Sequence, residues 1–185
     1  MIVKTLTEKP PKPENRGKAF IYHFLMFNVG AFRNVEIGDA FFDAMEVALT
    51  RKKEVFWAYF GRVSGKDIVV DKAELVPEDA HSISEELECE VNPKRFKEWV
   101  DEFRAENRDY FLVGLGHVHR NLDIPTDNDA VYLSGIVPEG VYSIYHARKG
   151  VLRFFRTREK TYAPVPAKIL NTSSKYQDVK ILSNW

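Results

Sequence analysis

The feature that most constrains the fold is an amphipathic helix followed at once by a buried strand. In the segment NPKRFKEWVDEFRAENR, from residue 92 to 108, the apolar residues recur at helical spacing and form one stripe. Asn92 can cap this helix, and Pro93 stands where the first helical position tolerates proline. The next segment, DYFLVGLGHVH, is a continuous apolar run that predicts a buried strand. The pair predicts a protein in which helices and strands share one core.

The other segments predict a mixed order of strands and helices. Helical spacing and a capping Asp39 predict a helix that ends in basic residues near 51–53. The segment PTDNDAVYLSG predicts a short capped helix. Apolar and aromatic runs predict strands at 18–27, 54–63, 67–77, 86–92, 109–119, 140–150 and 151–157. This order predicts an α/β (α+β) domain with helices packed on one curved sheet.

Composition divides the chain of 185 residues into one domain and two extensions. Residues 1–17 are rich in Pro, Lys and Glu and predict an extended N-terminal arm. Residues 18–157 hold the predicted strands and helices. Residues 158–185 predict an irregular C-terminal tail, because Pro164 and Pro166 interrupt it.

The charge balance restricts the expected partners. The chain has 27 basic and 27 acidic side chains, and this neutrality argues against nucleic acid or an anionic membrane as partner. A single cysteine, Cys89, rules out a disulfide within the chain and fits a reducing compartment. No apolar run reaches the roughly 20 residues that a membrane-spanning helix needs, and the N-terminus is a poor signal peptide. We therefore expect a cytoplasmic protein.

The segment GLGHVHRNLDIPTDND, residues 114–129, carries the candidate site. Side chains two apart on a strand point the same way, so His117 and His119 share a face. Asp129, from the following helix, can supply a third ligand to a zinc ion and leave a fourth position open. A structural interpretation also stays open. Thr126 and Asp129 have the spacing of a capping box, and the histidines would then be ordinary strand-end residues.

The wider pattern resembles the JAMM (MPN+, or Mov34/PAD-1) metalloprotease family. Glu54 opens EVFWAYFGR, LVGLGHVH leads into the His-x-His pair, and IPTDND is similar to the family's Ser-x-x-Asp segment. The resemblance covers about residues 35–157 and implies a cytidine-deaminase-like fold. It implies that His117, His119 and Asp129 bind zinc, and that Glu54 is the general base. It also implies that Thr126, in place of serine, stabilises the oxyanion.

The resemblance further implies a class of substrate. Family members cleave amide bonds, often at the C-terminus of ubiquitin or ubiquitin-like proteins. Few residues separate Asp129 from the last predicted hairpin, so the chain resembles the compact prokaryotic members that act on ubiquitin-like or small sulfur-carrier proteins. Arg120 stands where the family usually has proline, and we expect it to bind an acidic group of the substrate or the C-terminal carboxylate of a product.

Several alternatives accompany this interpretation. Glu46 is a rival general base, although its helical spacing predicts an exposed position. Asp123 and Asp127 are alternative carboxylates near the motif. A second hypothesis is a non-catalytic interaction module on the same scaffold, and a third, disfavoured by the neutral charge, is a role with nucleic acid. The residues for which we expect core or surface roles are His23, His81, His146 and Cys89.

Overall fold

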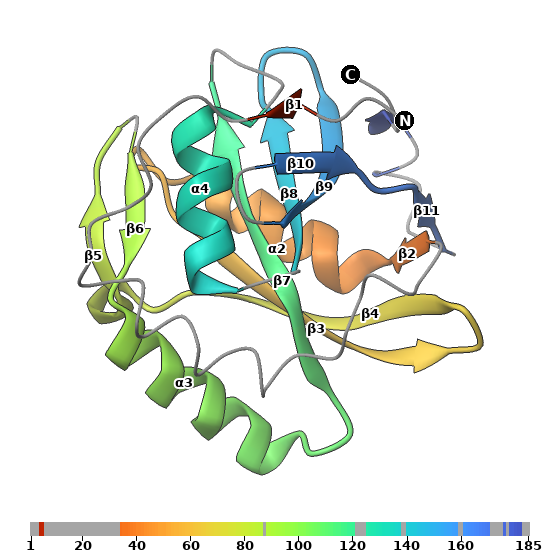
Figure 1. The fold of residues 1–185 in the computed structure, drawn as a ribbon, viewed down its shortest axis with the longest axis horizontal. Coiled ribbons are helices and arrows are strands. Elements are labelled where there is room, and N and C mark those ends of the chain that lie inside the picture. The colour runs from red at the N-terminus through yellow and green to blue at the C-terminus, as the bar shows by residue number, and fades with distance from the viewer. Residues whose placement is uncertain are drawn as a thin grey trace.

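One large sheet organises the protein (Figure 1). The structure is a computed structural model and describes residues 4–5, 34–86, 88–120, 125–137, 140–158, 161–170, 176 and 178–182. The strands of the large sheet are β1 (Lys4–Thr5), β2 (Asn34–Ile37), β3 (Trp57–Ser64), β4 (Asp67–Leu75), β7 (Phe111–His119), β8 (Val141–His146), β9 (Val151–Arg158), β10 (Thr161–Pro164), β11 (Ala167–Ile169) and β12 (Lys180–Leu182). Their order is β1-β10-β9-β8-β7-β3-β4-β2-β11, and β12 pairs with β9.

The sheet is mixed: the pairs β7–β8, β4–β2, β2–β11 and β9–β12 are parallel, and the other pairs are antiparallel. The central strand β7 runs antiparallel to β3 and parallel to β8. The parallel pairing places His119 beside His146, at the end of both strands. A separate two-stranded sheet joins β5 (His81–Ser84) to β6 (Cys89–Val91). The observed class is therefore a mixed α+β domain, as expected from the sequence.

Helices cover both faces of the large sheet (Figure 1). Helix α2 (Asp39–Leu49) buries Phe41 against Trp57 and Tyr59 on one face. Helices α3 (Pro93–Glu106) and α4 (Asp127–Ile136) cover the other face, where Phe103 stacks on Phe60 with ring centroids 3.9 Å apart. The short 3-10 turn η2 (Glu78–Ala80) links β4 to β5. The buried sheet thus separates two apolar cores, and the site lies on the α4 side.

The glycines of β7 allow its neighbours to approach closely. A Cβ atom on Gly114 would lie 1.5 Å from the carbonyl oxygen of Val141, and one on Gly116 would lie 2.3 Å from the ring of Trp57. Neither position tolerates a side chain without a shift of the adjacent strand. The pattern Gly-Leu-Gly therefore fixes β7 tightly between β3 and β8 immediately before the two histidines.

The helix predictions are confirmed with two corrections, both at α2. The side chain of Asn92 accepts hydrogen bonds from the backbone N–H groups of Lys94 and Arg95, and it caps α3 as expected. At α2, however, Gly38 is the N-cap and Asp39 is the first helical residue. An acidic residue there still interacts favourably with the helix dipole. The basic residues 51–53 follow the end of α2 rather than forming its last turn.

The predicted irregular tail is wrong for its described residues, because β10, β11 and β12 lie within it. Strand β11 pairs with β2, and β12 pairs with β9, so tertiary pairing outweighs the local prolines. In the predicted arm, β1 pairs with β10. The predicted strand at 18–27 lies outside the described residues. Among the described helices, none combines the length and the apolarity needed to cross a membrane.

Candidate metal centre

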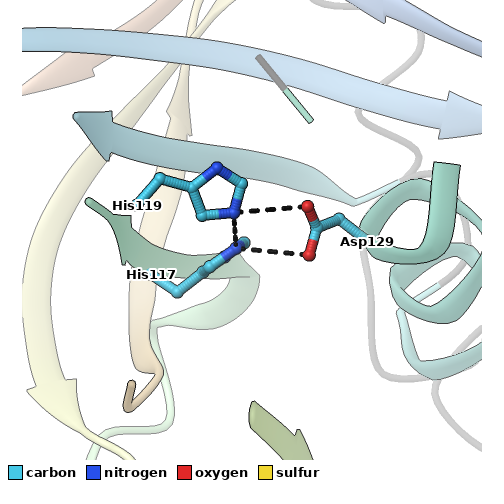
Figure 2. Close-up of side chains that lie close together, drawn as sticks. All are labelled: His117, His119 and Asp129. Atoms are coloured by element: carbon cyan, nitrogen blue, oxygen red, sulfur yellow. Dashed lines mark hydrogen bonds and ion pairs between the residues drawn. The ribbon is translucent and has the colours of Figure 1, made fainter. Parts of the chain in front are cut away.

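The two histidines and the aspartate of the sequence motif meet at one point (Figure 2). His117 and His119 stand at the end of β7 and point to the same side, and Asp129 points back at them from the first turn of α4. Both imidazoles are buried, with exposed fractions of 1% and 7%. One nitrogen or oxygen atom from each of the three residues lies within 4.8 Å of the other two. This group can bind a metal ion.

The distances fit a small tetrahedral ion. The Nε2 atoms of His117 and His119 are 2.8 Å apart, and they lie 3.4 and 3.3 Å from the two carboxylate oxygens of Asp129. Zinc–nitrogen bonds of about 2.0–2.1 Å at tetrahedral angles separate two ligand atoms by about 3.3 Å. To bind such an ion, the two nitrogens would have to move apart by about half an ångström, and one oxygen of Asp129 would have to face both of them. The donor set, two imidazoles and a carboxylate, is also one that zinc accepts.

A helix cap holds the carboxylate in place. Oδ2 of Asp129 accepts hydrogen bonds from the backbone N–H of Thr126 at 2.8 Å and from its hydroxyl at 2.7 Å. The hydroxyl oxygen of Thr126 in turn accepts from the backbone N–H of Asp129 at 3.1 Å. The predicted capping box is therefore present. It leaves Oδ1 directed at His117, so the cap and the metal ligand are the same side chain.

The site favours the protonation states that bind a metal. Burial opposes the charge of Asp129, but the two histidines outweigh this and hold its pKa well below the usual range. Burial lowers the pKa of His117, even though Asp129 acts in the opposite direction. A carboxylate that stays ionised and an imidazole that stays neutral are the forms that coordinate a metal.

Glu54 lies beside this group as a buried carboxyl. Its exposed fraction is 8%, and its pKa is raised to about 7. Burial is the main cause and Asp129 adds to it, whereas the charges of His119 and Arg120 lower the pKa. Glu54 precedes β3 rather than opening it, since the strand begins at Trp57. A carboxyl with this pKa can both accept and donate a proton near neutral pH.

Strand β5 fixes the backbone on both sides of Glu54. The hydroxyl of Ser84 donates to the carbonyl of Glu54 at 2.9 Å, and the N–H of Glu54 donates to the carbonyl of Glu85 at 2.6 Å. Nε2 of His81 accepts from the N–H of Phe56 at 3.2 Å. We expected a core or surface role for His81, and we did not single out Ser84. Their segment, HSIS, carried no signal that placed it beside Glu54.

Arg120 has a structural contact that the sequence did not predict. Its guanidinium donates to the carbonyl oxygens of Arg51 and Lys52 at 3.1 and 2.9 Å. It thereby ties the end of β7 to the loop that leads into Glu54. Arg120 and Glu54 also line a shared cavity of about 90 Å³. Because Arg120 lines this cavity, a group bound in the cavity can contact Arg120, as expected for a substrate.

The alternative residues lie elsewhere or cannot be placed. Glu46 is exposed on α2, as its spacing predicted. His146 is buried, and its Nδ1 accepts from the N–H of Lys149 in the turn after β8. Cys89 is half-buried on β6, and burial raises the pKa of its thiol. Asp123 and His23 lie outside the described residues, as does the side chain of Asp127.

Comparison with known proteins supports the fold but names no family. No protein-family model matches the chain, and no curated protein sequence matches it. Among solved structures, it is similar to the solution structure of protein DSY2949 from Desulfitobacterium hafniense. The TM-score is 0.61 at 14% sequence identity, over 77% of this chain and 97% of that one. At this identity the likeness shows a shared fold alone.

Proposed function

We propose that the chain is a zinc-dependent peptidase of the JAMM type, with the JAMM/MPN, cytidine-deaminase-like form of the α+β fold. The observation that carries the proposal is the meeting of His117, His119 and Asp129 beside the buried carboxyl of Glu54. Three protein ligands with a fourth position open are typical of catalytic zinc sites, whereas structural zinc sites have four protein ligands.

In this proposal each residue has one task. His117, His119 and Asp129 would hold the zinc ion, and a zinc ion bound there would supply a water of pKa about 7 and a Lewis acid for a carbonyl. Glu54, a buried carboxyl beside the three ligands, takes a proton from the attacking water and delivers one to the leaving amine. Thr126 orients Asp129 through its hydroxyl, and the oxyanion role that the JAMM resemblance implies would require this single hydroxyl proton to turn from Asp129 to the oxyanion.

We propose amide bonds at the C-terminus of ubiquitin-like or sulfur-carrier proteins as the substrate class. This part of the proposal comes from the JAMM resemblance of the sequence. A C-terminal tail is an extended segment, and an extended segment can add beside a sheet edge. Such a tail would bring its last carbonyl to the group formed by His117, His119 and Asp129.

The deciding experiment is elemental analysis of the purified protein. We expect about one zinc per chain, since one set of three ligands is present. His119→Ala should lose the zinc, whereas Glu54→Gln should retain it and lose at least about a hundredfold in hydrolysis of a ubiquitin-like conjugate. Glu46→Gln is the matched control, because Glu46 is exposed on α2. Absence of zinc after its addition would reject the proposal.

A second candidate function is an interaction module without catalysis. The capping box favours it, because Thr126 satisfies Oδ2 of Asp129 and gives this carboxylate a structural role of its own. In that case neither zinc nor hydrolysis should be found, and His119→Ala should change only the stability of the fold. The same elemental analysis separates the two functions.

A further inference from the structure

A larger cavity lies on the other side of the segment that carries Glu54. It has a volume of about 390 Å³, at the small end of the range for ligand pockets. The cavity is bounded by the loop 51–55, the end of β4, η2 and β5. Apolar side chains line part of it, among them Val55, Leu75 and Val76. An occupant can therefore bury apolar surface there.

Three consecutive cations form another part of this pocket. Arg51, Lys52 and Lys53 all line it and are exposed. Within the described part of the chain, their side chains form no ion pair or hydrogen bond. Glu78 is the acidic residue in the lining. The excess of positive charge favours an acidic occupant, oriented with its carboxylate toward residues 51–53.

The cationic wall continues to the proposed catalytic carboxyl. Arg51 and Lys53 also line the smaller cavity, which contains Glu54 and Arg120. The two cavities are thus neighbours that share a boundary, and Glu54 stands between Lys53 and Val55 in the chain. An extended polypeptide bound at Glu54 can continue across this shared boundary into the larger pocket.

We infer that this pocket is a substrate subsite that binds an acidic side chain, and an apolar neighbour, of the polypeptide near its scissile bond. The inference rests on the proposed peptidase function, and it adds a preference that the metal ligands do not provide. Lys52 and Lys53 attract the carboxylate, while Val55, Leu75 and Val76 contact the apolar neighbour. Arg120 holds this loop in place through the carbonyls of residues 51 and 52.

The binding test uses the full chain without added metal. The probes are two blocked hexapeptides of Leu, Glu and Gly, identical except that Gln replaces each Glu in the second. In an NMR titration, the Glu peptide should shift amides of residues 51–55 and 75–84. It should bind about fivefold more tightly than the Gln peptide, and about 0.5 M salt should reduce this difference.

Charge variants test whether the cations at residues 51–53 cause the preference for the Glu peptide. Lys52→Glu should weaken binding of the Glu peptide about tenfold, because attraction becomes repulsion at an exposed position. Lys66→Glu is the matched control, since Lys66 is exposed in the turn at the far end of the β3–β4 hairpin. It should leave the affinity unchanged. Equal affinity for both peptides, or equal effects of the two variants, would overturn the subsite.

Hydrolysis by zinc-loaded protein separates this inference from the proposed function. Cleavage of acidic and neutral conjugates at equal rates would reject the subsite and leave the peptidase. Tight, Lys52-dependent binding of the Glu peptide without cleavage of any conjugate would reject the peptidase, and with it the substrate role of the pocket.

Discussion

At the scale of single residues, Asp129 is both a helix cap and a candidate metal ligand. One of its oxygens accepts two hydrogen bonds from Thr126, and the other faces His117. The hydrogen bonds at the start of α4 therefore fix the orientation of the Asp129 carboxylate, which would otherwise rotate freely. Groups that orient a metal ligand in this way typically contribute ten- to a hundredfold to metal affinity, on the order of 1.4–2.7 kcal/mol.

Thr126→Ala tests this double role. Loss of the cap should lower the free energy of unfolding of the metal-free protein by about 1 kcal/mol. It should also weaken zinc binding about ten- to a hundredfold, because Asp129 loses the donor that orients it. Denaturation in urea and competition with a zinc chelator measure the two effects. Thr126→Ser keeps the hydroxyl, so it should retain both the stability and the zinc affinity of the wild type. Unchanged zinc affinity in Thr126→Ala would mean that Thr126 does not orient Asp129.

The raised pKa of Glu54 predicts a pH dependence of stability. In the metal-free protein this pKa is about 7, above the 4.5 that is usual for a glutamate in an unfolded chain. Between these values the folded protein holds a proton that the unfolded chain has released. The contribution of Glu54 to the free energy of unfolding is therefore lost as the pH rises through this window. Urea unfolding from pH 5 to pH 8 should show this loss in the wild type and not in Glu54→Gln.

The matched control for that measurement is Glu46→Gln. Glu46 is exposed, so its replacement should leave the pH dependence of the wild type in place. Parallel curves for the wild type and Glu54→Gln would show that the Glu54 carboxyl is ionised at pH 5 in the folded protein. Its role as a general base near neutral pH would then lose its support.

At the scale of elements, the small β5–β6 sheet supports the site from outside the main sheet. Ser84 and His81 bond the backbone at Glu54 and Phe56. The ring of Phe56 lies parallel to that of His81, with centroids 6.2 Å apart, and meets His117 edge-on at 5.3 Å. The hairpin therefore fixes the backbone of the proposed base, Glu54, and contacts a candidate ligand, His117, through the intervening ring of Phe56.

Ser84→Ala should weaken this support without removing metal. The lost hydrogen bond is worth about 1 kcal/mol, which corresponds to about a fivefold decrease in kcat/KM if Glu54 shifts with its backbone. Zinc content should be unchanged, because Ser84 contacts no ligand. Ser82→Ala, at an exposed position on the same strand, is the control and should retain full activity. Equal activities of the two variants would contradict the positioning role.

The elements that the sequence predicted are those whose signals are local. Asn92 and Pro93 mark the start of α3, and Thr126 with Asp129 marks the capping box of α4. The alternation of a strand was enough to place His117 and His119 on one face. Local patterns thus predicted the three candidate ligands, and the structure brings them together.

The elements that the sequence missed depend on distant partners. Strand β5 is short and partly polar, and its role depends on β6 and on the backbone at Glu54. Strands β10 to β12 lie among prolines and polar residues, and they exist because β9 and β2 offer free edges. The pocket beside Lys52 likewise joins segments that are far apart in the chain. Propensity and periodicity carry no information about such partners.

At the scale of the whole molecule, the C-terminal segment pairs with strands in both halves of the large sheet. Strand β11 pairs with β2, near one edge, and β12 pairs with β9, toward the other. Between them, Tyr176 is buried, stacks on Phe42 with centroids 4.7 Å apart and donates a 2.6 Å hydrogen bond to Asp43. The segment is therefore part of the core under α2.

Tyr176→Ala should destabilise the whole domain. Removal of a buried aromatic ring costs about 3–5 kcal/mol, and Tyr176→Phe should cost only about 1 kcal/mol because the ring is kept. Urea denaturation followed by far-UV circular dichroism measures both. Lys180→Ala, at an exposed position in β12, is the control. A small effect of Tyr176→Ala would show that the segment packs only loosely on α2.

The short chain distance from His117 to Asp129 has a consequence for how the protein matures. Closing so short a loop has a small entropic cost, so the three ligands can meet early during folding. Glu54 is far away in sequence and joins them only when β3 pairs with β7, which closes a much longer loop. If the chain is the proposed peptidase, a partly folded form in which β3 has not yet paired with β7 would have its three candidate ligands together without Glu54 beside them. Such a form could hold a metal ion before it could cleave a substrate.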